Sequence, residues 1–287
     1  MKIYFSIFIY LVASLSLTAQ INKPSLSPKT TIQQQVGLAN INLSYSQPSK
    51  KGRIIFGSLI PYGKVWRTGA NAATKITLDK EASFANHLIP AGTYGLYTIP
   101  NKTEWTIIFH KKSNLWGDAG YQQENDFIRF STPSKTTTDT SETLNIYFEN
   151  YTVDGADFVI VWENTKVVIP VKVDSDAIIQ QQIDAEIINS KKVAAPQTYF
   201  DAAQYYYKKN KDLTTAFKWF SKAEALRPQA FWYTYYKGEL AYKLKKYKIA
   251  KLSAEKCLKD AKNSKASDFG YIAKCSLLLK EVDKKRK

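Results

Sequence analysis

The hydrophobic period changes once along the chain, near Ser175, and the change divides the 287 residues into two kinds of structure. Before it, short runs of β-branched and aromatic residues alternate with polar ones, which is typical of strands that bury one face. After it, apolar residues recur every three or four positions, which is typical of amphipathic helices. The sequence therefore predicts a β domain followed by an α domain.

Ten short strands are expected between residues 28 and 174. Residues 41–45 and 144–148 alternate most clearly, and residues 100–104 and 163–165 look like hairpin connections. Strands of this length and spacing favour an antiparallel β-sandwich or jelly roll. The expected strands are residues 31–37, 40–46, 74–79, 83–87, 94–99, 105–110, 127–132, 143–150, 157–162 and 166–172.

Residues 175–195 read as a connector, with a helix over 176–191, and residues 196–287 as a short tetratricopeptide-like array of helices. An internal repeat with a period near 34 supports this interpretation, and a generic helical bundle is the alternative. Arrays of this kind bind peptides or partner proteins, so we expect such a partner. The repeat positions are Phe200, Ala203, Tyr207, Ala216, Phe220, Ala223 and Pro228, then Gly238, Ala241, Ala250, Ala254 and Cys257.

The first 19 residues have the pattern of a secretory signal peptide. Lys2 precedes an apolar run over residues 3–17, and Ala19 is a small residue at the expected cleavage position. An uncleaved membrane anchor is the alternative, but the run is shorter than the ~20 residues that a spanning helix needs. We therefore expect a periplasmic or secreted protein without a transmembrane segment after cleavage, in which residues 20–27 form a linker.

The second half of the chain carries most of the positive charge. Residues 175–287 hold 24 Lys and Arg against 12 Asp and Glu, a net charge of +12. These cations fall on the polar faces of amphipathic helices, and nucleic-acid binding is not expected. Cys257 and Cys275 flank a turn at residues 263–267 symmetrically, so they are either a disulfide or two buried thiols in a helix interface.

The sequence offers little catalytic chemistry. The two histidines, His87 and His110, lie in or beside expected strands, and there is no glycine-rich phosphate loop after a strand. A zinc site would need both to meet a carboxylate such as Asp118, which the spacing does not require. No catalytic residue, metal site or cofactor is predicted.

Residues 52–74 form a long irregular segment that favours a functional loop or a self-packed one. Its cations suit an anionic ligand, its aromatic residues suit stacking on a sugar, and Asn71 suits a hydroxyl or amide. The structural alternative places Trp66 in the core, pairs Arg67 with Asp126 or another acid, and makes Asn71 cap a turn. The candidate ligand-binding residues are Arg53, Tyr62, Lys64, Trp66, Arg67 and Asn71.

Residues 28–173 resemble the bacterial family known as domain of unknown function 2911. The resemblance implies an exported bacterial protein, of the kind found in Bacteroidetes, and brings no established activity. This chain has Ala72 where an acidic residue is frequent, and His110 where an asparagine is frequent. The matching stretches are Ser27-Pro28, residues 45–49, 51–57 and 61–71, Pro90 to Tyr94, Thr98 to Pro100, Glu104 to Thr106, Trp116-Gly117, and Asp126 with Arg129.

Two hypotheses for function follow. In the first, this is an exported non-catalytic binding protein. Its β domain recognises a glycan or a small polar or anionic ligand through the 52–74 loop, and its helical repeats dock a partner. In the second, it is a hydrolase or isomerase that acts on a cell-envelope saccharide at the same loop. The scarcity of bases near neutral pH favours the first hypothesis.

Overall fold

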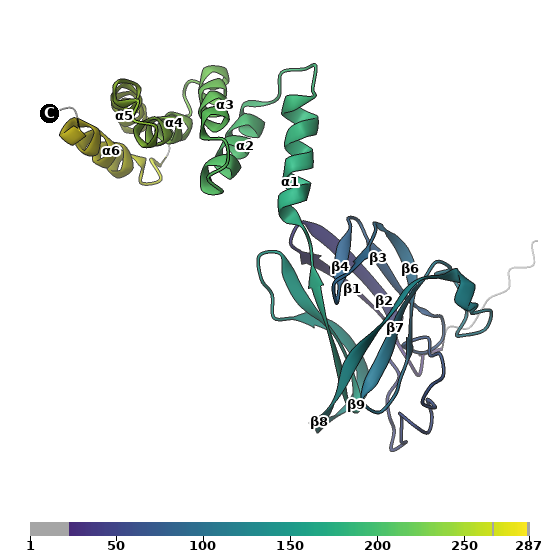
Figure 1. Ribbon diagram of the computed structural model, residues 1–287. Helices are drawn as coiled ribbons and strands as arrows, with labels where there is room; N and C mark the ends of the chain where they lie inside the picture. Colours follow the sequence, from purple (N-terminus) through teal and green to yellow (C-terminus); the bar gives the residue numbers. More distant parts are fainter. Residues whose placement is uncertain (1–22, 266, 286–287) are drawn as a thin grey trace, which may run out of the picture. The chain divides into compact units, whose positions relative to one another are not determined.

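The computed structural model describes residues 23–265 and 267–285. The expected signal peptide, residues 1–19, lies outside this range. The chain divides into two compact units between Asp174 and Ser175 (Figure 1). No helix in the described part of the chain is long and apolar enough to cross a membrane.

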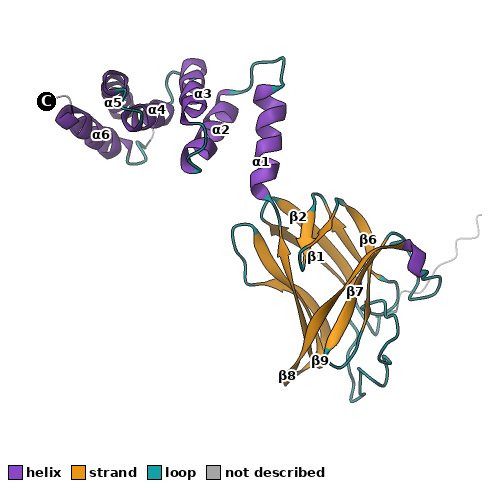
Figure 2. Ribbon diagram, in the orientation of Figure 1, coloured by secondary structure: helices purple, strands orange, loops and turns teal. Residues whose placement is uncertain are grey.

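The first unit is an antiparallel β domain whose nine strands belong to one hydrogen-bonded sheet (Figure 2). The strands are β1 (Lys29–Val36), β2 (Ala39–Ser46), β3 (Thr74–Leu78), β4 (Ala82–Phe84), β5 (His87–Ile89), β6 (Gly92–Ile99), β7 (Glu104–His110), β8 (Asp126–Glu149) and β9 (Gly155–Lys172). Their order across the sheet is β1-β2-β3-β6-β7-β8-β9-β4-β5. The β domain that the alternating pattern predicts is therefore confirmed.

The two longest strands bring distant parts of the sheet together. Residues 126–133 of β8 pair with β7, and residues 134–149 form the part that pairs with β9. The Tyr45 hydroxyl of β2, which is not a sheet neighbour of β8, accepts from the Ile146 amide at 2.9 Å. The core therefore lies between β2 and β8, and its largest fully buried side chains include Ile41, Leu43, Trp105, Phe109, Phe158 and Trp162.

Three boundaries differ from the expected strands. Residues 127–132 and 143–150 are parts of one strand, β8, because irregularities between Thr136 and Asn145 keep it paired with β9. The expected hairpin at residues 163–165 is wrong, since these residues lie within β9, where Glu163 has a φ of +53°. Residues 83–87 contain the turn between β4 and β5.

The second unit consists of helices packed on one another in chain order. They are α1 (Ser175–Ile183), α2 (Pro196–Lys208), α3 (Leu213–Leu226), α4 (Phe231–Lys243), α5 (Tyr247–Lys262) and α6 (Tyr271–Lys285). The α domain that the helical period predicts is therefore confirmed. The single helix expected over 176–191 is shorter, because α1 is followed by a π-helical turn at Asp184–Ile188.

Small residues let α4 and α5 approach each other closely. A Cβ atom added at Gly238 would lie 2.9 Å from the Ser253 Cβ, too close for a carbon contact. Ala241, Ala250 and Ala254 are fully buried in the same region. Adding a methyl group at Gly238 would therefore force the two helices apart.

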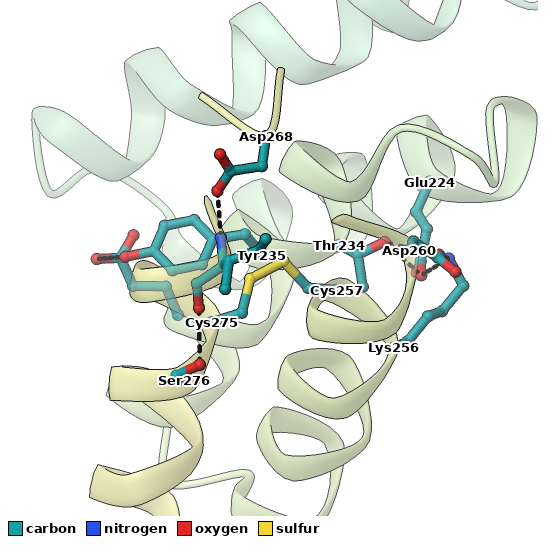
Figure 3. The surroundings of a disulfide bond; sticks show 11 residues. Glu224, Thr234, Tyr235, Lys256, Cys257, Asp260, Asp268, Cys275 and Ser276 are labelled. Atoms are coloured by element: carbon teal, nitrogen blue, oxygen red, sulfur yellow. Dashed lines mark hydrogen bonds and ion pairs between the residues drawn. A yellow bond between two sulfur atoms is a disulfide. The ribbon is translucent and has the colours of Figure 1, made fainter. Parts of the chain in front are cut away.

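A disulfide joins α5 to α6. Cys257 and Cys275 are bonded, their Cα atoms lie 6.1 Å apart, and both residues are fully buried (Figure 3). Tyr235 and Tyr271 pack against the buried cluster that contains this pair. The bridge closes a loop of the chain and so restricts the unfolded state.

Replacing both Cys257 and Cys275 with alanine should lower the free energy of unfolding of the helical unit by ~3 kcal/mol, because the loop-closure constraint is lost. Urea unfolding followed by helical circular dichroism would measure the loss. Reduction of the unaltered protein should produce a similar loss. Titration of two thiols in the unreduced, denatured protein would contradict the pairing.

Glu224 is a mostly buried acid whose contacts join α3, α4 and α5. Its side chain is 13% exposed, and its carboxylate accepts from Lys237 Nζ at 2.6 Å and from Thr234 Oγ1 at 3.0 Å. Lys256 Nζ lies 3.6 Å away (Figure 3). Burial by itself raises the pKa of Glu224, but these hydrogen bonds and charges outweigh it and lower the pKa below its ordinary value of 4.5.

Because the folded-state pKa is the lower one, Glu224 stabilises the fold above about pH 4.5, and this contribution is lost as the pH falls through the folded value. Glu224→Gln should therefore destabilise the protein at pH 7 and lose less stability than the parent on acidification to about pH 3. Urea midpoints across this range would measure both effects. The exposed Glu255→Gln variant is the control and should follow the parent. Equal acid sensitivity in Glu224→Gln and the parent would contradict the assignment.

Candidate functional site

The 52–74 loop lines a groove of about 820 Å³ on the β unit. Five of the six candidate residues line it: Arg53, Lys64, Trp66, Arg67 and Asn71. Tyr62 is not among the lining residues. Its ring instead covers Gly57, where an added Cβ atom would meet the ring at 2.6 Å. The loop therefore gathers most of the expected binding groups in one place.

Main-chain hydrogen bonds fix the loop to the sheet although the loop is irregular. Trp66 and Thr98 of β6 exchange two of them, at 2.8 and 2.9 Å. The carboxylate of Glu163 accepts from the amides of Ile55 and Phe56 at 3.3–3.4 Å. Glu163, at a bulged position in β9, thus supplies hydrogen-bond acceptors to the start of the loop. Its turn-like sequence context did not indicate this role.

Trp66 belongs to the core beneath the groove. Its side chain is 7% exposed, and its indole N–H donates to the Gly69 carbonyl at 3.0 Å. Its ring stacks on Trp162 at 5.9 Å and meets Trp105 edge-on at 6.1 Å. Of the roles considered for Trp66, the structure therefore shows the one in the core.

Thr68 and Asn71 have left-handed backbone conformations, with φ values of +54° and +59°. Such a conformation is unusual for a β-branched residue, and Thr68 is also fully buried. Its hydroxyl donates to Thr98 Oγ1 at 3.1 Å, and its carbonyl accepts from Thr74 Oγ1 at 2.8 Å. These contacts hold the turn that carries Arg67.

Two guanidinium groups in the groove bind backbone carbonyls. Arg53 donates to the carbonyls of Lys50 at 2.9 Å and Ser49 at 2.6 Å. Arg67 donates to the Asn71 carbonyl at 2.9 Å. Neither forms an ion pair within 4.0 Å with an acid in the described ranges. Both therefore keep a positive charge that no contacting carboxylate neutralises, together with unused N–H donors.

Asp126 does not pair with Arg67. It is bound instead by Arg129 and by the Tyr121 hydroxyl at 3.0 Å, so the Arg67–Asp126 pair considered from the sequence is wrong. The acid nearest to Arg67 in the groove lining is Asp118. Burial raises the pKa of Tyr97 to about 12, with Asp118 adding to the rise and Arg67 opposing it.

Trp116 lines the groove although the sequence did not indicate it as a binding residue. Its side chain is 69% exposed, and its backbone bridges to Ala72 of the loop. The next residue, Gly117, has a φ of +70°, and an added Cβ atom there would lie 2.7 Å from Arg67 Nη1. The Trp116-Gly117 pair, in the segment between β7 and β8, could have indicated this turn from the sequence. Glycine permits the turn and the close approach of the Arg67 guanidinium.

The histidines lie outside the groove lining. His110 is fully buried, and its two ring nitrogens are within 3.0–3.1 Å of the carbonyls of Lys112 and Gln122. His87 stacks on Phe130 at 4.7 Å. No group of three metal-ligating side chains is found in the part of the chain that the structure describes.

Comparison with known families gives one match. A family model described as "Protein of unknown function (DUF2911)" matches residues 27–171, about half of the chain. This span contains the whole 52–74 loop, Trp116 and Asp118. A search of curated proteins finds no match.

Truncating the two tryptophans of the groove should change the free energy of unfolding by very different amounts. Trp66→Ala should lower the free energy of unfolding by ~3–5 kcal/mol, because it leaves a cavity among buried rings. Trp116→Ala, its matched control, should change the stability by less than ~0.5 kcal/mol, since most of that side chain faces solvent. Chemical denaturation followed by far-ultraviolet circular dichroism would measure both. A large loss for Trp116→Ala would show that this ring is part of the core.

Proposed function

The chain belongs to this family of proteins of unknown function, and we propose that its β unit is a binding module for an acidic saccharide. The ligand lies in the groove of the 52–74 loop. Binding occurs without cleavage of the saccharide.

The charge of the groove is the observation that carries this proposal. Four cationic side chains line it, from Lys51, Arg53, Lys64 and Arg67, and one acid among the described lining residues, Asp118, opposes them. A guanidinium held by backbone carbonyls is already oriented, so it loses little conformational freedom when it binds a carboxylate. The groove therefore favours an anion over a neutral or cationic ligand.

Trp116 supports a saccharide as the carrier of that anion. Its exposed indole face offers an apolar platform beside the cations. A sugar ring presents a flat apolar C–H face together with hydroxyl groups, and the amphipathic indole suits such a surface. A groove of about 820 Å³ is within the size range of small-molecule sites.

Binding without hydrolysis follows from the acids available. Most glycosidases use two carboxylates that flank the scissile bond. Asp118 is the single carboxylate among the described residues that line the groove. The hydrolase hypothesis therefore receives no support from a carboxylate pair at this site.

We also propose that the protein is exported. The signal-peptide pattern of residues 1–19 supports export to the periplasm or beyond. A disulfide between Cys257 and Cys275 suits an oxidising compartment.

We also propose that the helical unit is tetratricopeptide-like and docks a partner. The equal 13-residue lengths of α2 and α4, each of which packs on the helix that follows it, support a repeat.

The test compares a trimer of galacturonic acid with a neutral galactose trimer, using the chain from Gln20 onward. Titration calorimetry and tryptophan fluorescence should detect the acidic trimer, more weakly as salt is added. Arg67→Ala should weaken its binding about 10-fold, because one charge-assisted contact is lost. The same variant should cost only about 1 kcal/mol of stability, since a hydrogen bond and no buried ion pair is removed.

Lys102→Ala, an exposed cation on the turn between β6 and β7, is the control and should bind like the parent. Equal affinity for the two trimers would contradict recognition of an anion. Unchanged affinity in both Arg67→Ala and Arg53→Ala would contradict the location of the site.

A further inference from the structure

The helical unit contains a cluster of four tyrosines around one glutamate, formed by Tyr207 of α2, Tyr235, Tyr236 and Glu239 of α4, and Tyr271 of α6. Tyr235 donates to the Glu239 carboxylate at 3.3 Å. The Tyr235 ring lies 5.4 Å from that of Tyr271 and 5.2 Å from that of Tyr236. All five residues are partly buried, so the cluster is partly exposed to solvent.

Glu239 has no contacting cation. It forms no ion pair within 4.0 Å in the part of the chain that the structure describes, whereas Glu224 of the same unit contacts two lysines. Burial raises the pKa of Glu239 above its ordinary value, and the hydrogen bond from Tyr235 and the charges of Lys274 and Lys243 offset only part of this rise. Burial, with neighbouring groups that include Glu239, also raises the pKa of Tyr207 and of Tyr271. A partly buried carboxylate is thus left without a neutralising contact.

Two lysines of the chain itself show what kind of cation suits this surface. Lys243 Nζ lies 5.2 Å from the centre of the Tyr207 ring, and Lys274 Nζ lies 4.6 Å from that of Tyr271. Lys243 also donates to Asn210 at 3.0 Å. These ammonium groups lie on tyrosine faces at the edge of the cluster, and a further ammonium is complementary to the carboxylate at its centre.

The disulfide restrains the helix that carries one member of the cluster, Tyr271. Tyr235 and Tyr271 pack on the buried cluster that contains Cys257 and Cys275. The disulfide links α6, the helix that carries Tyr271, to α5 (Figure 3). A site held in this way loses little conformational entropy on binding.

We propose that the tyrosine–glutamate cluster receives a lysine side chain of a partner protein. Its ammonium group binds the Glu239 carboxylate, and its aliphatic stem packs against the tyrosine rings. This inference rests on the proposal that the helical unit docks a partner, and it specifies the chemistry of that contact.

The test uses isotope-labelled protein from Gln20 onward and three blocked amino acids as probes. N-acetyl-lysine amide should shift the amide resonances of α4 near Glu239, and N-acetyl-norleucine amide, which lacks the charge, should shift them much less. Glu239→Gln should weaken lysine binding about 10-fold, and Glu281→Gln, at a partly exposed acid outside the cluster, should not weaken it. Tyr271→Phe provides a second variant if Glu239→Gln fails to fold, and it should weaken binding by a smaller factor.

Equal shifts from the lysine and norleucine probes would overturn the proposal, as would unchanged binding in the Glu239 and Tyr271 variants. N-acetyl-glutamate amide separates this failure from that of partner docking. If N-acetyl-glutamate amide alone shifts the α4 resonances, Lys243 and Lys274 bind an acidic partner. The docking proposal is then retained and the lysine site is rejected. If no probe shifts the α4 resonances, both the docking proposal and the lysine site are rejected. Neither result bears on saccharide binding by the β unit.

Discussion

The groove depends on how an irregular loop satisfies its backbone. A loop packed on a sheet must find partners for its amide and carbonyl groups, because an unpaired buried polar group is costly. Here the partners come from Thr98 of β6 and from the Glu163 carboxylate of β9. Beneath the loop, the rings of Phe56, Trp66, Trp105 and Trp162 meet at centroid distances of 4.9–6.2 Å. These contacts place the loop without using its cations.

Because main-chain and aromatic contacts hold the loop in place, the groove keeps its positive charge. If Arg67 had paired with a buried acid, its guanidinium would have been neutralised by the fold itself. Arg67 instead donates to the Asn71 carbonyl, and Arg53 to two carbonyls of residues 49–50. A carbonyl orients a guanidinium but does not cancel its charge. Orientation without neutralisation is a suitable starting state for binding an anion.

Local patterns predicted the fold class, whereas contacts distant in sequence decided the details. Alternation and helical period are properties of neighbouring residues, so both domain types follow from them. The continuity of β8 and β9 does not, because bulges keep residues such as Glu163 in a strand despite a turn-like sequence. Most of the groove residues were predictable because they crowd one segment. Trp116 and Asp118 were not assigned to the groove, since they come from a different part of the chain and join it only in three dimensions.

The two units use the same physical arrangement with opposite charge. In the β unit, a buried aromatic cluster supports cations that lack contacting acids. In the helical unit, tyrosines packed on a disulfide surround Glu239, which lacks a contacting cation. Leaving a partly buried charge unpaired lowers the stability of the isolated protein, and a ligand of opposite charge can recover that loss on binding. Because the two unpaired charges differ in sign, one ligand chemistry cannot satisfy both, and the proposed saccharide and the proposed partner are therefore distinct.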